Sequence, residues 1–464
     1  MIGECDNVGV TVPGRPRVGQ QRNTGGIAVL KKLVRILISA ACIILLIISW
    51  LAATSSRTTA EKQLTLINEA IALINDGIYI RAVPLLEEAA GYEAVNTRIA
   101  ETLLKRAYLA LIDNRGFPRR YTTLLDKQMN RRDAEPNMFL EAANYYLSIS
   151  KTPEALSVLR NGLEKTGDEN ILSLYENTRY AFNINRAAYE DVTAIFNNTI
   201  QVKSDGKWGL ANADGFLIIP CQYDKISTLN RGRAVVRNGN SIYAIDIDNN
   251  RIAVSHEDVL DFGNFAENRI SLLVDGRWRR ATGEFEHGDK TFDDIGTYSG
   301  GYAAAKYNGR WGVIDISDNW LIPAEFDEVI QDELGRCFAQ DTVFVRQDGL
   351  VYMFTRGAFT EAVFEDAKPF SDEGYAAVKK NGSWGFINTR GDVTIPFIYD
   401  DALSFGQHLA AVKTGACWGY INLFGNIVID TKFQNAKSFS DGSAPVLTDR
   451  GWQFITLLEF STKN

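Results

Sequence analysis

The sequence has 464 residues, of which 45% are hydrophobic and 23% charged, and its formal net charge is −8 at pH 7. This length is enough for two or three domains with sizeable cores. The charge is uneven, since residues 189–464 hold 26 Lys and Arg against 38 Asp and Glu, a net charge of −12. Because nucleic-acid binding needs a basic face, this acidic part argues against a nucleic-acid partner.

The cysteines and histidines do not follow the spacing of a metal site. The five cysteines are an odd number with no pair at metal-ligand spacing, and the chain has only three histidines. A structural zinc site needs four such ligands close together. We therefore expect no disulfide framework, no metal and no cofactor.

An apolar segment near the N-terminus predicts a membrane helix. Residues 36–53, ILISAACIILLIISWLAA, are 18 residues without a charge, which is close to the length that crosses a bilayer. Basic residues precede the segment and Trp50 lies near its far end. We expect a disordered basic tail over 1–33 and a transmembrane helix over 34–54, with the N-terminus in the cytoplasm by the positive-inside rule. A cleaved signal peptide is the alternative.

Residues 55–188 predict a helical domain. Apolar residues recur at three- and four-residue steps in EKQLTLINEAIALINDGIYIRAVPLLEEAAG, with a break at Asp76-Gly77, which predicts two amphipathic helices in a hairpin. LEAANYYLSISKTPEALSVLRNGLEK repeats the plan. Both hairpins resemble the tetratricopeptide repeat family, which implies a helical-repeat shape, with a peptide-binding groove as its functional form. The residues that carry the resemblance are Gly77, Tyr79, Ala82, Leu86, Ala89, Glu154, Ala155, Leu156, Leu159 and Gly162.

Residues 189–464 consist of eight related units with a period near 34. Each unit alternates short apolar runs with Gly, Asn and Asp, which is typical of short strands and tight turns. A unit of three strands cannot bury its faces alone, so neighbouring units must stack. The units start at Tyr189, Tyr223, His256, Phe292, Phe326, Phe364, Tyr399 and Phe433.

The sixth unit, NGSWGFINTRGDVTIPFIYDD, shows the local plan. Asn381-Gly382 predicts a two-residue hairpin turn, because both positions of a type I′ turn take positive φ. Five other units have Asn-Gly or Asp-Gly at the same turn, at 205–206, 238–239, 275–276, 308–309 and 348–349, and the same turn is predicted there. Trp384 is expected to pack on one face of the next strand, while Gly385 leaves room on the other face for a neighbouring backbone or ring. Pro396 is expected to end a strand, and Asp400 to bond backbone amides at a turn.

The pattern G-x-W-G-x-I-x…G…I-P…[YF]-D resembles the WG-repeat family of bacterial proteins, most closely in KWGLANADGFLIIPCQYD (207–224) and RWGVIDISDNWLIPAEFD (310–327). The resemblance implies an all-β repeat array and says little about activity. Eight units favour a propeller-like ring, because closure hides the sheet edges, and an open β-solenoid or spiral is the alternative. The signature residues, to which we assign structural roles, are Trp208, Gly209, Trp278, Trp311, Gly312, Trp384, Gly385, Trp418, Gly419, Trp452, Pro220, Pro323 and Pro396.

Paired carboxylates are the one feature that suggests catalysis. They recur at the same phase of several units, whereas an enzyme needs a catalytic pair once and a repeated fold needs a turn every time. The chain has no G-x-S-x-G, P-loop or H-E-x-x-H motif. We expect that the protein is not an enzyme, and a site assembled across units is the less favoured alternative. The pairs are Asp293-Asp294, Asp327-Glu328, Glu365-Asp366 and Asp400-Asp401.

These features predict a single-pass, membrane-anchored scaffold in the bacterial cytoplasmic (inner) membrane. Its helical and β-repeat surfaces would face a protein or peptide partner outside the cytoplasm. The alternative is binding of a carbohydrate or cell-envelope polymer by aromatic rings outside the repeated Trp position. A site is expected where the units differ: at Trp320, in the insertion around Gln331 to Thr342, and in the second and fifth units, which lack the Trp. The candidate rings are Tyr302, Tyr307, Trp320 and Tyr375.

Overall fold

The computed structural model describes residues 24–92, 94–255 and 258–460. These residues form two compact units, one ending at Ala134 and the other beginning at Glu135. The division falls inside the helical region for which the sequence predicted one domain. The predicted tail lies outside the described residues as far as residue 23, as does His256, the start of the third repeat unit.

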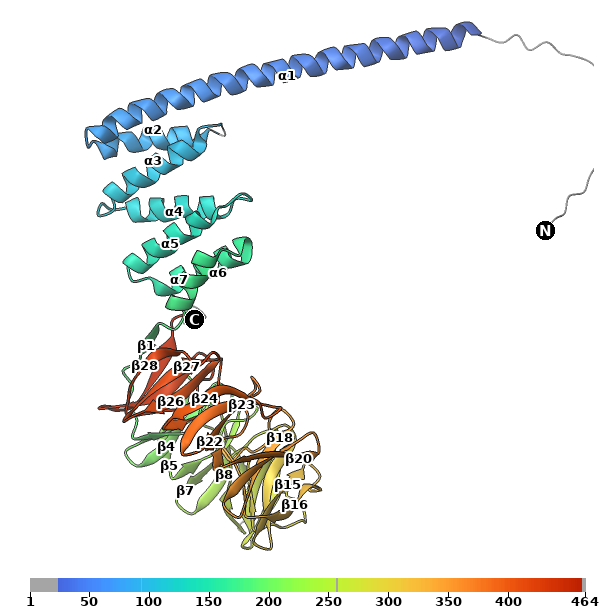
Figure 1. Ribbon diagram of the computed structural model, residues 1–464, viewed down its shortest axis with the longest axis vertical. Helices are drawn as coiled ribbons and strands as arrows, with labels where there is room; N and C mark the ends of the chain where they lie inside the picture. Colours follow the sequence, from blue (N-terminus) through green and yellow to red (C-terminus); the bar gives the residue numbers. More distant parts are fainter. Residues whose placement is uncertain (1–23, 93, 256–257, 461–464) are drawn as a thin grey trace, which may run out of the picture. The chain divides into compact units, whose positions relative to one another are not determined.

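The helices come first along the chain, and the strands follow them (Figure 1). The first unit holds α1 to α4 and the second holds α5 to α7. The helices are α1 (Thr24–Asn75), α2 (Tyr79–Gly91), α3 (Thr97–Ala110), α4 (Phe117–Met129), α5 (Pro136–Ser148), α6 (Thr152–Thr166) and α7 (Glu169–Thr178).

Helix α1 is longer than the sequence predicted. It runs without a break through the expected domain boundary at residue 54, and residues 24–33, expected in the disordered tail, belong to it. Within α1, Ala40–Asn75 is long and apolar enough to cross a membrane by length and composition, with a mean hydropathy of 1.7 over an 18-residue window. A signal sequence meets the same criterion.

The predicted break at Asp76-Gly77 separates α1 from α2, and Gly77 has a φ of +76°. Small residues let neighbouring helices approach closely, as at the fully buried Ala82 and Ala100. In the second unit, a Cβ on Gly162 of α6 would lie 2.8 Å from the Phe139 Cβ of α5. Both pairs of segments thus form the helical hairpins that the apolar spacing predicted.

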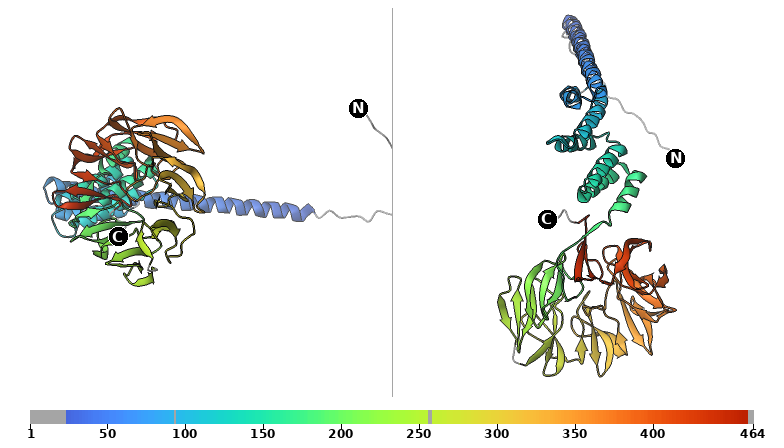
Figure 2. Two further views of the ribbon diagram at one scale, coloured as in Figure 1. Left: turned by 90° about the horizontal axis from the view of Figure 1, so that it is seen from below. Right: turned by 90° about the vertical axis from the view of Figure 1, so that its left-hand side faces the viewer.

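The strands form eight small antiparallel sheets among the described residues (Figures 1 and 2). We call the sheets blades one to eight in chain order. Blades one to four are β2 (Asp191–Val192), β3 (Thr199–Ser204), β4 (Lys207–Asn212), β5 (Leu217–Tyr223); β6 (Lys225–Ile226), β7 (Arg233–Asn238), β8 (Ser241–Asp246), β9 (Arg251–Val254); β10 (Val259–Phe262), β11 (Ile270–Val274), β12 (Arg277–Ala281); and β13 (Asp294–Ile295), β14 (Tyr302–Tyr307), β15 (Arg310–Asp315), β16 (Trp320–Phe326). Blades five to eight are β17 (Glu328–Val329), β18 (Thr342–Gln347), β19 (Leu350–Thr355), β20 (Ala358–Phe364); β21 (Asp366–Ala367), β22 (Tyr375–Lys380), β23 (Ser383–Asn388), β24 (Val393–Tyr399); β25 (Asp401–Ala402), β26 (Leu409–Thr414), β27 (Cys417–Asn422), β28 (Ile427–Phe433); and β29 (Asn435–Ala436), β30 (Ser443–Thr448), β31 (Gly451–Leu457), β1 (Phe182–Ile184).

The eighth blade closes the ring. Its outermost strand is β1, which enters from the start of the β region and pairs antiparallel with β31, the last strand of the chain. In Figure 1 the red strands of the last blades therefore lie beside the green strands of the first. The β region is an eight-bladed propeller, and this pairing rules out the open solenoid.

Helices α6 and α7 are tied to the end of the propeller by one carboxylate. Glu459 follows β31, and its side chain is only 8% exposed. Arg160 donates to it from α6 at 2.9 Å, and the Tyr175 hydroxyl donates to it from α7. Because all three side chains belong to the second compact unit, the last helices and the propeller form one body.

The hairpin turns lie where the Asn-Gly and Asp-Gly pairs predicted them, with one shift of register. Asn381 and Gly382 have φ values of +53° and +80°, which fits a type I′ turn between β22 and β23. In the second blade Asn238 pairs with Ser241, so the turn residues are Gly239 and Asn240 and not the predicted Asn238-Gly239. Gly239 alone has a positive φ, +59°, which fits a type II′ turn.

A bulge in the outer strand explains the signature Gly and corrects the role of the Pro. Trp384 pairs with Tyr399 and Phe386 with Ile395, so the outer strand holds two extra residues between these pairs. A Cβ on Gly385 would lie 2.8 Å from the Ile395 carbonyl oxygen, because the bulged backbone folds over it. The sequence had predicted that Pro396 ends a strand, and this prediction was wrong, because Pro396 lies within β24. Its missing N–H falls in the bulge, where the strand ladder is already interrupted.

The same construction recurs in three other blades. A Cβ added to Gly209, Gly312 or Gly419 would lie 2.5, 2.4 or 2.6 Å, respectively, from the carbonyl oxygen of an Ile. Pro220 and Pro323 lie inside β5 and β16, one residue after that Ile. The Gly and the Ile-Pro pair are therefore two halves of one local structure.

Candidate functional site

A cavity of about 1000 Å³ lies at the centre of the propeller. Its wall is formed mainly by the loop that follows the short first strand of a blade, and six blades contribute such a loop: one, four, five, six, seven and eight. Because equivalent loops of a closed ring face this space, it is the central channel of the propeller.

The loop of the fifth blade is about twice as long as its counterparts. Twelve residues separate β17 from β18, whereas six or seven separate the corresponding strands of the other blades. The extra length is the insertion that the sequence singled out around Gln331 to Thr342, and eight of residues 331–341 line the cavity. We call residues 331–341 the plug.

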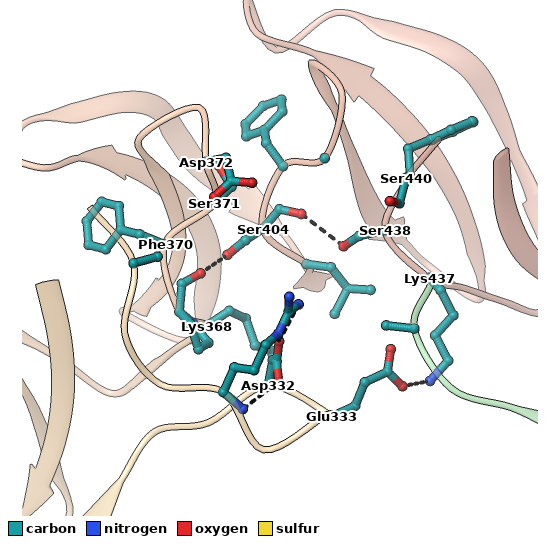
Figure 3. Close-up of a pocket in the computed structure, with 18 of the residues that line it drawn as sticks. Asp332, Glu333, Lys368, Phe370, Ser371, Asp372, Ser404, Lys437, Ser438 and Ser440 are labelled. Atoms are coloured by element: carbon teal, nitrogen blue, oxygen red, sulfur yellow. Dashed lines mark hydrogen bonds and ion pairs between the residues drawn. The ribbon is translucent and has the colours of Figure 1, made fainter. Parts of the chain in front are cut away.

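The plug reaches across the channel to other blades. The Leu334 carbonyl accepts hydrogen bonds from Asn264 of the third blade, at 3.1 Å, and from the Thr297 hydroxyl of the fourth. Glu333 forms an ion pair with Lys437 of the eighth blade, which Figure 3 shows facing it. The Arg336 guanidinium lies 5.5 Å from the ring centroid of Phe196 in the first blade. The plug is therefore held in place by contacts with four other blades.

Two ion pairs neutralise part of the charge that the plug brings into the channel. Arg336 pairs with Asp332 at 2.7 Å, and Lys437 pairs with Glu333. The surrounding protein displaces water from Glu333 and raises the pKa of that carboxyl, while the Lys437 ammonium opposes the shift. Cys337, within the plug itself, is buried, and burial raises the pKa of its thiol to about 12. A thiol held neutral in this way is not a nucleophile.

Serines from consecutive blades line the same wall, and most of them serve the fold. The Ser404 hydroxyl donates to the Pro369 carbonyl at 2.6 Å, and the Ser438 hydroxyl donates to the Ser404 carbonyl at 3.0 Å (Figure 3). Each of these bonds joins one blade to the preceding one. Ser371 differs, because it is 8% exposed and its hydroxyl has no hydrogen-bond partner among the described residues.

The turns after these loops form a chain of hydrogen bonds from blade to blade. Glu373 accepts from the His408 amide at 3.0 Å, and Gln407 accepts from the Gly442 amide at 2.6 Å. Asp441 accepts from the Asn198 amide at 3.1 Å, which carries the chain across the closure from the last blade to the first. The rim of the channel is therefore held by side chains of the turns themselves.

The sequences of these blades match a known repeat. Six segments fit the family model described as the WG containing repeat: residues 208–241, 289–311, 311–350, 360–384, 384–416 and 418–452. The propeller carries WG repeats. Trp278 lies outside the matched segments, in the third blade, where Arg279 takes the place of the signature Gly.

Comparison with solved structures gives matches at low sequence identity and low TM-score. The chain is similar to Hsv2p of Kluyveromyces lactis (10% identity, 50% of this chain and 97% of that chain, TM-score 0.34). It is also similar to the Cps50 (Swd1) β-propeller domain of Myceliophteria thermophila (10%, 50% and 96%, TM-score 0.31) and to YCF48 from Cyanidioschyzon merolae (12%, 60% and 99%, TM-score 0.31). Comparison with curated protein sequences gives no match. Likenesses at these TM-scores say nothing of what the WG repeats bind.

The Trp of each WG repeat lies opposite the aromatic residue that starts the next unit. Strand pairing joins Trp208 to Tyr223, Trp311 to Phe326 and Trp418 to Phe433, and isolated bridges join Trp278 to Phe292 and Trp452 to Tyr189. Trp384, Trp418 and Trp452 are buried, and the other three are partly buried. Among these rings, Trp418 also lines the cavity.

The repeated carboxylates of the WG repeats accept hydrogen bonds from hairpin-turn amides. Asp400 accepts from the Gly415 amide at 2.6 Å, and Asp293 from the Gly309 amide at 2.8 Å. Asp293 also pairs with Arg277, and the Gly309 amide and this guanidinium hold the pKa of its carboxyl below the usual value. The first carboxylates of these two pairs therefore have structural partners at the hairpin turns.

The four candidate rings fall into two groups. Tyr302 packs against Phe338 with ring centroids 4.4 Å apart, and Tyr375 packs against Phe405 at 5.4 Å, so both join neighbouring blades. Tyr307 and Trp320 lie on the fourth blade, 43% and 38% exposed, with ring centroids 6.5 Å apart. The structure thus brings two of the four rings together on the surface and places none of them in the central cavity.

Sequence reasoning missed most of the cavity wall. It pointed to the plug, because the insertion breaks the repeat, but not to Lys368, Ser371 or Asp372, which belong to a regular unit. A usable signal was present: a Phe recurs in these loops at Phe370, Phe405 and Phe439, and the polar residues beside it vary. Aligning the loops on that Phe would have located the wall.

Proposed function

We propose that this protein is a membrane-anchored scaffold whose WG-repeat propeller binds a protein or peptide partner. The observation that carries the proposal is the central cavity, a polar site of about 1000 Å³ at the centre of a closed ring. Six blades contribute to its wall, so a ligand there is recognised by many variable loops on one rigid support.

The anchor is the second part of the proposal. Ala40–Asn75 meets the length and composition of a membrane span, and Lys31, Lys32 and Arg35 precede its most apolar part. By the positive-inside rule the N-terminus then lies in the cytoplasm of a bacterial cell, and the propeller lies outside it. Protease treatment of intact cells tests this: the propeller should be digested, and a propeller that is cut only after lysis contradicts the topology.

The binding role is tested by crosslinking in intact cells. A cleavable amine-reactive crosslinker should join the full chain to a discrete partner, which is then identified and purified. The purified partner should bind the full chain in detergent and not a chain that lacks residues 451–464, in which the propeller cannot close. Failure of the purified partner to bind the full chain would contradict the scaffold role.

A carbohydrate or envelope polymer is the second candidate, favoured by the exposed pair Tyr307 and Trp320. Aromatic rings exposed side by side offer the flat apolar faces on which sugar rings pack. A cell-wall fraction should then retain the full chain and lose it on Trp320→Ala. Equal retention of this variant, or no retention of the parent, would contradict the carbohydrate role.

A further inference from the structure

We propose that the central cavity takes a basic side chain, lysine or arginine, from a peptide segment of the partner, and that Ser371, Asp341 and Asp372 hold its cation. This inference rests on the proposed function, since it names the part of the partner that enters the ring. It concerns a site on the adjoining turns of the fifth and sixth blades, labelled in part in Figure 3.

The first argument is the charge balance of the wall. The lining holds six carboxylates and three cations. Arg336 and Lys437 are already paired with two of the carboxylates. The remaining carboxylates outnumber the remaining cation, so the empty volume has a negative potential that attracts a cation. The carboxylates are Asp332, Glu333, Asp341, Asp372, Glu373 and Asp401, and the cations are Arg336, Lys368 and Lys437.

The second argument is which carboxylates remain available. Glu373 accepts from the His408 amide, and Asp401 accepts from the Ala402 amide at 2.8 Å. The side chains of Asp341 and Asp372 have neither a hydrogen bond nor an ion pair within the described part of the chain. Their turns are adjacent, because the Gln340 amide group donates to the Asp372 carbonyl at 2.9 Å. Two available carboxylates on neighbouring turns suit a single ammonium or guanidinium group.

The third argument is independent of charge and concerns Ser371. Ser371 is one of the residues that line the cavity and is 8% exposed, and its hydroxyl oxygen, which lies just beneath the cavity surface, has no partner in the described structure. A buried hydroxyl without a hydrogen bond costs about 1–3 kcal/mol, so such groups are rare unless a ligand satisfies them. Ser371 immediately precedes Asp372, and a rotation about its Cα–Cβ bond would turn the oxygen toward the cavity, where it could accept from the same cation that the carboxylate attracts.

Lys368 completes the recognition of a peptide. Its ammonium lies 5.2 Å from the ring centroid of Trp384 and has no carboxylate within ion-pair distance among the described residues. An entering peptide carries backbone carbonyl oxygens beside its basic side chain, and a lysine ammonium donates to such oxygens. A cavity of about 1000 Å³ has room for a side chain with its flanking backbone.

The test uses a fluorescent four-residue lysine peptide amide and the purified full chain in detergent, with anisotropy as the readout. Asp372→Asn and Asp341→Asn should each weaken binding about tenfold or more, as expected for loss of a hydrogen bond to a charged group. Asp430→Asn, which removes an exposed carboxylate from β28, is the matched control and should leave affinity within about twofold. Equal losses in all three variants would show that the peptide binds by net charge alone and would overturn the site.

Ser371→Ala separates binding from folding. The hydroxyl has no partner to lose, so the unfolding midpoint should stay the same or rise, while peptide affinity falls. A variant that binds the peptide like the parent overturns the role of Ser371. If Asp341→Asn and Asp372→Asn leave peptide affinity unchanged while the crosslinked partner still binds, the cavity site is wrong and the scaffold role stands. If peptide binding follows the prediction but no purified partner binds, the scaffold role is wrong.

Discussion

Ile184 lies opposite Ile455 in the eighth blade, so the first β-strand of the chain is paired with the last. Almost the whole propeller lies between these two residues in sequence. The ring therefore closes by a contact of very long range, through an outer strand of only three residues.

Asn183→Pro should open this closure. Asn183 lies on the outer strand β1, pairs with Thr456 of β31 and is exposed. The substitution therefore removes a backbone donor and little packing. We expect a loss of about 1–3 kcal/mol in the free energy of unfolding, measured by urea denaturation. Asn183→Ala keeps the donor and should stay within about 0.5 kcal/mol of the parent. Similar losses in both variants would show that β1 does not close the ring through its backbone.

Gly312→Ala should disturb the bulge of the fourth blade. The added Cβ would lie 2.4 Å from the Ile322 carbonyl oxygen, and its nearest neighbours are all backbone atoms of β16, which cannot move away without disturbing the sheet. We expect a loss of about 1–3 kcal/mol and faster amide exchange in β15 and β16. Gly91→Ala, at a glycine with open space around it, should not destabilise the chain. Unchanged exchange in β16 after Gly312→Ala would contradict the role of the bulge.

Asp293 and its neighbour Asp294 should respond to pH with opposite sign. The pKa of Asp293 is lowered by the Gly309 amide and Arg277, so its stabilisation is present above the ordinary pKa and is lost as pH falls through the lowered value. Burial raises the pKa of Asp294, so its carboxyl costs stability as pH rises through the ordinary pKa to the raised value.

Unfolding of the two Asn variants between pH 3 and pH 6 tests this difference. Asp293→Asn should be more destabilising at pH 6 than at pH 3. Asp294→Asn should be less destabilising at pH 6 than at pH 3. Parallel pH profiles for the two variants would contradict the assignment, because the two residues are adjacent and only their surroundings differ.

Asn264→Ala should loosen the plug without unfolding the ring. The Asn264 side chain donates to the Leu334 carbonyl and also lies within 3.2 Å of the Gln201 amide nitrogen. We expect faster hydrogen exchange over residues 331–341, by about tenfold, and little change in the strands of the sixth and seventh blades. Equal acceleration in those strands would show that Asn264 supports the whole ring and not the plug in particular.

Much of this fold could be predicted, because repetition in sequence becomes repetition in structure. The pair Asn381-Gly382 is enough by itself to identify a turn. Eight repeat units that cannot bury their faces alone must form a stacked array. The closure could not be predicted with the same force, since β1 is a segment of three residues, FNI, with no repeat signature. The prediction for Pro396 was wrong because proline usually ends a strand for lack of a backbone donor, and here the bulge over Gly385 removes the need for that donor.

The cavity was harder to predict than the blades. An insertion marks the plug in the sequence, but nothing local says that residues 331–341 turn into the ring and reach Asn264 and Lys437. Trp320 and Tyr307 were selected as rings outside the repeated slot, and they do lie together on the surface. Tyr302 and Tyr375 met the same criterion and pack between blades, since exposure depends on neighbours far along the chain.

The most direct measurement is photo-crosslinking in intact cells with a photoreactive amino acid at residue 440, which lines the cavity, or at residue 430 on the outer strand β28. The account predicts that residue 440 crosslinks to the partner and that residue 430 does not. The peptide recovered from the partner should contain lysine or arginine at the crosslinked segment. Crosslinks to the partner from residue 430 alone, or from both positions equally, would contradict the claim that the partner enters the centre of the propeller.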